Sequence, residues 1–303
     1  WGAQNIEKVR AVVGSTIFMT LIGGSFIAFL GVIFARPILS ALGIDEDVMH
    51  LSLPYVQWML AGSPLLFVYI IYTSILRGVG DSTTPLIASG MTILIGFCVT
   101  PVLIAGYFGF PKLGIVAPAI ATILGFVSVL TFLYFYLNYK QHPLRLDAQL
   151  LRHIRFDRQL SKIILRLGVP TGIQMITTSV AGLVIVGLVN RHGADATAAY
   201  GAVNQVLNYI QFPALSIAIA ASIFGAQAIG AGKSELLAKV TRTALGMNIT
   251  ITGSLVVLAY LFSKYLMALF ITDHAVVELG QQLLFIVLWS ILFFGASAIF
   301  ASI

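Results

Sequence analysis

Long apolar runs alternate with short polar intervals along the whole chain, and this alternation predicts its secondary structure. Eight runs contain no Asp, Glu, Lys or Arg and reach the roughly 20 residues that a helix needs to cross the hydrocarbon of a bilayer. These runs are Ala11–Phe34, Leu51–Leu76, Pro85–Pro111, Leu113–Tyr139, Leu167–Asn190, Ala196–Ser222, Thr243–Ser263 and Leu279–Ile303. The pattern predicts an all-α polytopic membrane protein with eight transmembrane helices.

The composition agrees with this fold class and excludes several function classes. Charged residues make up 9% of the chain and hydrophobic residues 59%, whereas soluble domains carry roughly 25% charged residues. The net charge of +6 comes from loops, so it does not indicate nucleic-acid binding. A single Cys98 rules out a disulfide framework. The five histidines lie in loops or at span ends without a metal-binding spacing, so we expect no metal, no cofactor and no enzymatic activity.

The longest polar interval, Tyr139–Arg166, predicts which way the protein faces. It holds seven of the 17 Lys and Arg residues, and placing it in the cytoplasm puts thirteen of them inside and four outside. Lys and Arg accumulate in cytoplasmic loops. From Asp147 onward, apolar residues such as Leu150 and Ile154 recur at helical spacing, which predicts an amphipathic surface helix. We interpret this linker as anchored to anionic lipid rather than to nucleic acid.

An internal repeat relates the two halves of the chain. The tripeptide Gly2–Gln4 recurs at Gly225–Gln227, in each case just before a span that starts at the cytoplasm. Beyond that span, Leu39–Ile44 matches Leu266–Ile271 at nearly the same offset. Six spans separate the copies, so both have the same orientation. This predicts a two-lobed bundle built from a duplicated six-helix unit, with a substrate site between lobes related by an axis along the membrane normal.

The repeat also predicts the domain organisation. Spans five and six have no partner before Gly2, and spans three and four have none after Ile303. The chain begins at Trp1 without a signal peptide, and we expect an interior segment that covers helices three to ten of twelve. The predicted divisions are an N-lobe (residues 1–138), a cytoplasmic basic linker (residues 139–166) and a C-lobe (residues 167–303).

A short turn between spans two and three carries a family resemblance. Its sequence is Arg77-Gly78-Val79-Gly80-Asp81-Ser82-Thr83-Thr84-Pro85. Glycines permit positive φ, Thr84 can cap a helix and Pro85 fits its first position, so turn chemistry explains every residue type. As a pattern within a duplicated six-helix unit, however, Arg77, Gly78, Gly80, Asp81 and Pro85 resemble the multidrug and toxic compound extrusion (MATE) family. Gly225–Gly232 resembles the glycine-rich loop before the ninth helix of that family.

The resemblance implies a secondary active efflux transporter that works by alternating access. It would export organic cations and drugs in exchange for Na⁺ or H⁺, as a monomer in a bacterial inner (plasma) membrane. The sequence departs from the family where acids are expected: polar positions of the fifth helix fall on Gly96 and Thr100, and a glutamate of the seventh falls on Thr178. No predicted span contains a carboxylate, so the coupling ion is not identified, and we expect its carboxylate in the first helix of the family.

Neutral polar residues remain as candidates for the substrate cavity. Spans five and six carry Gln174, Thr177, Thr178, Asn204, Asn208, Tyr209 and Gln211. Three amides recur at i, i+4 and i+7 on one face of span six, and such a face avoids lipid. Hydrogen bonding between neighbouring helices is the alternative explanation for each residue taken alone.

Two other functions are open. A flippase for lipid-linked precursors, from the same superfamily, needs Lys or Arg in the central cavity to hold a pyrophosphate, and no predicted span contains either. An intramembrane enzyme or structural subunit lacks support, because the spans hold no acid, no histidine cluster and no nucleophile motif.

The positive-inside count generates a labelling prediction. In a full-length transporter with Cys98→Ser, a cysteine replacing Gln159 should not react with a membrane-impermeant reagent added to intact cells, because the linker is cytoplasmic. A cysteine replacing Lys112, on the opposite side, should react. Ready labelling at position 159 would invert the predicted topology.

Overall fold

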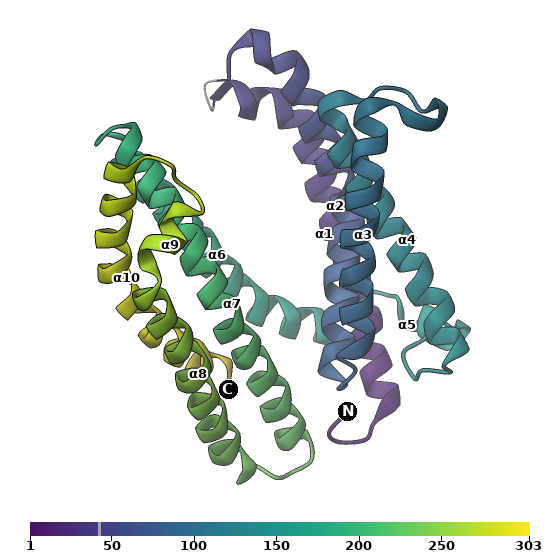
Figure 1. Cartoon of the computed structure of the whole chain (residues 1–303). Coiled ribbons are helices and arrows are strands. Elements are labelled where there is room, and N and C mark those ends of the chain that lie inside the picture. Colours follow the sequence, from purple (N-terminus) through teal and green to yellow (C-terminus); the bar gives the residue numbers. More distant parts are fainter. Residues whose placement is uncertain (42–43) are drawn as a thin grey trace. The chain divides into compact units, whose positions relative to one another are not determined.

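The structure, a computed structural model, describes residues 1–41 and 44–303. Long helices dominate it, as Figure 1 shows. Among the described residues, eight helices are long and apolar enough to cross a membrane, and two short helices, α5 and α9, lie between them. The helices are α1 (Ile6–Ala41), α2 (Glu46–Gly78), α3 (Thr83–Ala105), α4 (Ala117–Tyr139), α5 (Ala148–His153), α6 (Arg158–Asn190), α7 (Ala194–Gly230), α8 (Leu236–Leu261), α9 (Ser263–Ala268) and α10 (His274–Ser302).

The prediction of eight transmembrane helices is confirmed. Most of the predicted spans lie within the observed helices, which extend further into the polar intervals because a helix continues past the hydrocarbon. The third span is the clearest exception, since it was expected to reach Pro111. There α3 ends at Ala105, where Gly106 adopts φ 73° and donates its N–H to Val102. Positive φ is favourable for glycine, so this residue ends the helix.

The chain folds as two compact units. Unit 1 comprises Trp1–Gln4 and Leu167–Ile303, and unit 2 comprises Asn5–Arg166.

The core of unit 2 lies where α1, α2 and α4 meet. Tyr72 and Leu76 of α2 pack with Val129 and Leu133 of α4 and with Val13 of α1, and all five are buried. Close contacts use small residues: a Cβ added to Gly62 of α2 would lie 2.5 Å from Cγ1 of Ile123. Without a hydrophobic driving force between helices in lipid, such close packing supplies much of the attraction.

The linker after α4 is part of the unit 2 core rather than a free connector. Leu144 and Leu150 are fully buried in the same cluster as Tyr72. The Tyr72 hydroxyl donates a hydrogen bond to the Leu144 carbonyl oxygen at 2.7 Å. A Cβ added to Gly14 of α1 would lie 2.3 Å from the carbonyl oxygen of His153. The linker backbone therefore lies directly against α1 and α2.

The surface helix expected from Asp147 onward is wrong in extent. Helix α5 has six residues, and the chain then breaks before α6 begins at Arg158. Asp147 caps α5 by accepting a hydrogen bond from Leu150 N at 2.8 Å. Asp157 caps α6 by accepting from Leu160 N at 3.0 Å. Two caps ten positions apart in the chain specify two helix starts, so Ile163 and Ile164 belong to α6.

Helices α7, α8 and α10 form the packed part of unit 1. Their buried residues make two clusters, one around Val206, Val256 and Leu288 and the other around Ala218, Ala244 and Ile299. Between these clusters along each helix lie Ala214, Asn248 and Gly295. Helix α6 differs, because its apolar residues are exposed and no helix of the described chain packs along it.

The residues of the internal repeat can be located in the structure. Gly2 lies against the end of α7, where a Cβ would sit 2.3 Å from the carbonyl oxygen of Gln227. The two copies of the Gly-Ala-Gln sequence therefore meet within unit 1. In the second copy, Leu266–Ala268 belongs to α9. In the first, Leu39–Ala41 ends α1, and Leu42 and Gly43 lie outside the described residues.

The contact between α8 and α10 predicts a position that tolerates no side chain. A Cβ at Gly295 would lie 2.3 Å from Oδ1 of Asn248, so Gly295→Ala should force the helices apart and lower stability by about 1–3 kcal/mol. Thermal unfolding in detergent measures the loss. Gly246→Ala is the control, because its Cβ would meet nothing within 4 Å. Adding Asn248→Ala to Gly295→Ala should restore stability, and equal losses in both glycine variants would contradict the contact.

Candidate functional site

In the glycine-containing turn between α2 and α3, most residues make hydrogen bonds that end one helix or begin the next. The Gly80 N–H bonds to the Arg77 carbonyl at 2.9 Å, and the Asp81 N–H bonds to the Leu76 carbonyl at 3.0 Å. With Gly80 at φ 94°, this is a Schellman motif, which satisfies the last carbonyls of the helix. Arg77 donates to the Ser74 hydroxyl at 3.0 Å. The turn therefore has a structural explanation independent of any ligand.

Asp81 then begins the next helix. Its carboxylate accepts hydrogen bonds from the Thr84 N–H at 3.0 Å and from the Thr84 hydroxyl at 2.5 Å. The expectations that Thr84 caps α3 and that Pro85 takes its first position are thus wrong. Helix α3 starts at Thr83, Asp81 supplies the acceptor, and the buried Pro85 is the third helical residue. Proline fits there because the first N–H groups of a helix have no intrahelical partner.

The electrostatics of this turn involve the start of the linker. Partial burial tends to raise the pKa of Asp81, but the hydrogen bonds from Thr84 and the nearby His142 hold it below its ordinary value. The pKa of His142 is lowered, mainly by burial, with Asp81 opposing that effect. Lys140 lies 4.8 Å from the ring centroid of Tyr136. The turn and the first residues of the linker thus form one polar cluster at the end of unit 2.

The predicted cavity residues of α6 are exposed. Thr177 and Thr178 donate hydrogen bonds to carbonyl oxygens four residues earlier, to Ile173 at 2.9 Å and Gln174 at 3.0 Å. Their hydroxyl protons are therefore used within the helix, while their oxygens and the Gln174 amide point away from it. Such groups can accept or donate hydrogen bonds to a partner without carrying charge.

The predicted residues of α7 lie on two different faces. Asn204 is half-buried and donates from its amide to the Tyr200 carbonyl at 3.0 Å. Asn208 is exposed and Gln211 half-buried along the same stripe. Tyr209 follows Asn208 by one residue, about 100° around the helix. It lines a separate apolar pocket of about 480 Å³ with Leu258 and Phe262 of the α8–α9 region.

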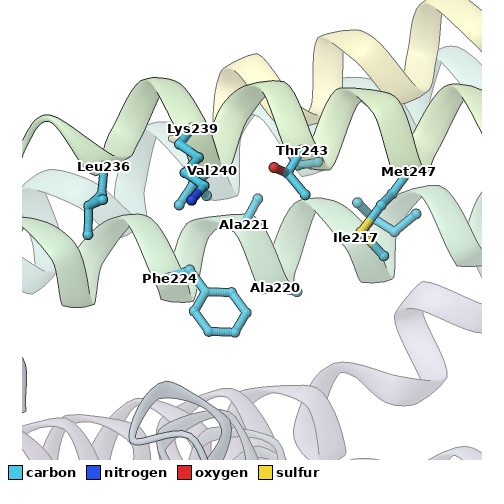
Figure 2. Close-up of a pocket in the computed structure, with 10 residues that line it drawn as sticks. Ile217, Ala220, Ala221, Phe224, Leu236, Lys239, Val240, Thr243 and Met247 are labelled. Carbon is cyan, nitrogen blue, oxygen red and sulfur yellow. The ribbon is translucent and has the colours of Figure 1, made fainter.

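A second apolar pocket lies between α7 and α8. Its volume is about 460 Å³, and Figure 2 shows its side chains coming from these two helices. The lining residues are Ile217, Ala220, Ala221, Phe224, Leu236, Lys239, Val240, Thr243, Ala244 and Met247. Lys239 is the single charged group among them, and none of the predicted cavity residues belongs to this pocket.

Sequence reasoning overlooked a polar pair in α8. Asn248 and Thr252, one turn apart, are buried, and the Asn248 Nδ2 and Thr252 Oγ1 atoms have no hydrogen-bond partner among the described residues. Thr16, Thr122 and Thr250, by contrast, bond to the carbonyl four residues earlier. An unsatisfied buried polar group costs about 1–3 kcal/mol. The i, i+4 spacing was visible in the sequence, but burial was not.

No group of three or more His, Cys, Asp and Glu side chains in the described chain is arranged to hold a metal ion.

Comparison with known proteins identifies the family. The pattern that defines the MatE family matches residues 1–102 and 170–303. The chain belongs to the MatE family. The resemblance seen in the glycine turn and the repeat is therefore confirmed, and MatE members are transporters rather than enzymes.

Several relatives support the assignment. The chain is 41% identical over 302 residues to the probable multidrug resistance protein YoeA of Bacillus subtilis, covering 100% of this chain and 65% of YoeA. It is 26% identical over 283 residues to the probable multidrug resistance protein NorM of Thermotoga maritima, covering 92% of this chain and 60% of that protein. The chain thus spans less than two thirds of the length of these relatives.

Solved structures share the fold. A MOP superfamily transporter from Pyrococcus furiosus matches with a TM-score of 0.83 and 21% identity, covering 99% of this chain and 69% of that one. A MATE solved in complex with MaD3S matches with the same TM-score and identity, covering 99% and 68%. The predicted MATE fold is confirmed.

The Asp81 cap generates a stability prediction. Asp81→Ala should lower the free energy of unfolding by about 1 kcal/mol, because the first turn of α3 loses its acceptor. The folded pKa is lowered, so this stabilisation is present above the ordinary value of 3.8 and is lost as pH falls through the folded pKa.

Thermal unfolding of the purified protein as a function of pH measures both effects. Asp45→Ala is the matched control, because Asp45 stands at the N-cap of α2 without a side-chain hydrogen bond. If the two alanine variants are equally stable, the Asp81 cap contributes nothing.

Proposed function

We propose that this chain is the central part of a secondary active efflux transporter that exchanges Na⁺ or H⁺ for organic cations and drugs. The observation that carries the proposal is membership of the MatE family, with 41% identity to a probable multidrug resistance protein over the whole chain. Alternating access would move a lobe of residues 1–138 against a lobe of residues 167–303, joined by the linker of residues 139–166. The protein would act as a monomer in a bacterial plasma membrane.

The substrate would be held by neutral polar groups. Gln174, Thr177 and Thr178 present amide and hydroxyl oxygens from an apolar helix whose side chains are exposed. Asn204, Asn208 and Gln211 add an amide stripe on α7. Amides left in hydrocarbon without partners cost several kcal/mol, so these positions fit a wet cavity better than lipid. Oxygen acceptors of this kind can bind cationic, amphipathic compounds without a fixed charge. Tyr209 lines the apolar pocket with Leu258 and Phe262 instead. It would therefore affect a substrate bound at the amide stripe without touching it.

The coupling ion requires a group outside the predicted spans of this chain. Those spans contain no carboxylate, whereas proton or Na⁺ exchange needs a group that changes charge or supplies anionic oxygen. The chain spans 65% of the length of YoeA. We place the coupling carboxylate in the remaining part of the full-length transporter, in the first of its twelve helices.

Export of an anionic amphiphile is the second candidate. The Lys239 ammonium lines the apolar pocket between α7 and α8, which suits an apolar molecule with a negative group. A relative from Shewanella oneidensis, 25% identical over 277 residues, is an FAD transporter. Loss of anion export with Lys239→Gln, with cation export unchanged, would favour this candidate.

Substitutions at the polar stripe test the leading proposal. In the full-length transporter, Asn204→Leu or Thr178→Val should change the export rates of individual cationic dyes by about 2–10-fold, because each loses a hydrogen bond worth about 0.5–1.5 kcal/mol. Efflux from cells loaded with a panel of dyes measures the change. Expression and membrane insertion should stay at wild-type levels.

Matched controls exist elsewhere in the chain. Asn138 is half-buried, as Asn204 is, and Thr250 is exposed, as Thr178 is. Both make the same bond to the carbonyl four residues earlier, at 2.8 Å in each case. Asn138→Leu and Thr250→Val should leave the dye profile unchanged. Wild-type export by the α6 and α7 variants, or identical effects in the controls, would leave the polar stripe with a packing role only.

A further inference from the structure

A small polar pocket lies between the start of α1 and helix α5, within unit 2. Its volume is about 370 Å³, and it is separate from the apolar pockets of unit 1. The lining residues are Ile6, Glu7, Arg10, Gln149, Arg152 and His153. It therefore combines two guanidinium groups, a carboxylate, an amide and an imidazole in one cavity, at the end of a transmembrane helix.

Arg10 is held in place by the linker. Its Nε donates to the Pro143 carbonyl at 3.0 Å, one terminal nitrogen donates to the Gln149 side chain, and the other lies 3.4 Å from an Asp147 carboxylate oxygen. These partners come from three successive parts of the linker. The guanidinium is thus fixed before any ligand arrives, which lowers the entropic cost of binding.

Arg152 and Glu7 have opposite charges and no ion pair among the described residues. Arg152 lies in the last turn of α5 and Glu7 in the first turn of α1, and both are exposed. Asp147, the nearest linker carboxylate, is engaged by Arg10 and Arg145. The pocket therefore offers one unpaired cation and one unpaired anion to a ligand.

Exposed apolar side chains lie beside the pocket. Leu151, next to Arg152, is 56% exposed, and Ile6 is 45% exposed. Further along the linker, the ring of Phe156 lies 6.5 Å from that of Phe18 of α1 and is 63% exposed. The linker residue Phe156 thus lies against α1 further from the start of that helix than the charged pocket does. This sequence of polar and apolar surface matches the depth profile of a membrane interface.

We propose that this pocket binds the headgroup of a phospholipid that carries both a phosphate and an ammonium group, of the phosphoethanolamine type. Arg152 and the fixed Arg10 bind the phosphate, since guanidinium groups donate paired hydrogen bonds to its oxygens. Glu7 binds the ammonium, and the acyl chains lie against Leu151 and Ile6. A purely anionic glycerol headgroup would leave Glu7 without a partner. The site fastens the linker to the leaflet, and it does not depend on the transported substrate.

Native mass spectrometry of the purified transporter, delipidated and then mixed with defined lipids, tests the proposal. Wild-type protein should retain phosphatidylethanolamine in preference to phosphatidylglycerol. Arg152→Gln should reduce retention of both lipids by about tenfold, because a hydrogen bond to a charged group is lost. Glu7→Gln should reduce retention of phosphatidylethanolamine only and so remove the preference.

Controls separate this site from general attraction to basic surface. Arg158→Gln removes a linker charge outside the pocket, and Glu278→Gln removes an exposed carboxylate of α10. Neither should change the lipid preference. Equal retention of both lipids by wild-type protein, or equal effects of Arg152→Gln and Arg158→Gln, would overturn the proposal. Displacement of the lipid by millimolar inorganic phosphate would also overturn it, because it would show a phosphate site without lipid specificity.

Discussion

Hydrocarbon offers no hydrogen-bond partner, and this constraint shapes every part of the chain. Each span must satisfy its own backbone N–H and C=O groups, which leaves the α-helix as the available structure. Six prolines nevertheless lie inside the spanning helices α1, α2, α3, α6 and α7. Each removes an N–H donor and frees the carbonyl one turn earlier. Among the described residues, backbone with positive φ lies at or beyond the ends of the spans, as at Gly80 in the turn before Asp81.

The same solvent also changes how the helices are held together. Apolar side chains gain nothing by leaving lipid, so contact depends on close approach and on a few polar groups. Gly62 against Ile123 and Gly295 against Asn248 are contacts of this kind. In unit 2, the buried hydrogen bond from Tyr72 to the linker adds a polar connection between helix and loop. Packing in each unit is therefore set by small residues at specific positions, which hydropathy alone does not reveal.

The sequence could predict features that depend on hydropathy and local backbone chemistry, but not those that depend on contacts between distant residues. The number of helices follows from the number and length of the apolar runs, and the turn at Gly80 follows from local backbone chemistry. Both could therefore be predicted from the sequence. The extent of α5 was not, because Leu150 and Ile163 share a helical spacing although Asp157 starts a new helix between them. The candidate site is harder still. Thr178 and Thr250 make the same backbone hydrogen bond whatever else they contact, and Asn248 is buried against Gly295, 47 positions away in the chain.

The docking of the linker has a consequence for synthesis on the ribosome. Groups that hold it, including Arg10, Gly14, Phe18 and Tyr72, precede it in the chain. Domains emerge and fold from the N-terminus onward during translation. The surface that receives Leu144 and Leu150 is therefore complete before α6 has left the ribosome. Unit 2 can therefore close the end that the linker covers early, and the second half of the chain then follows from a fixed starting point.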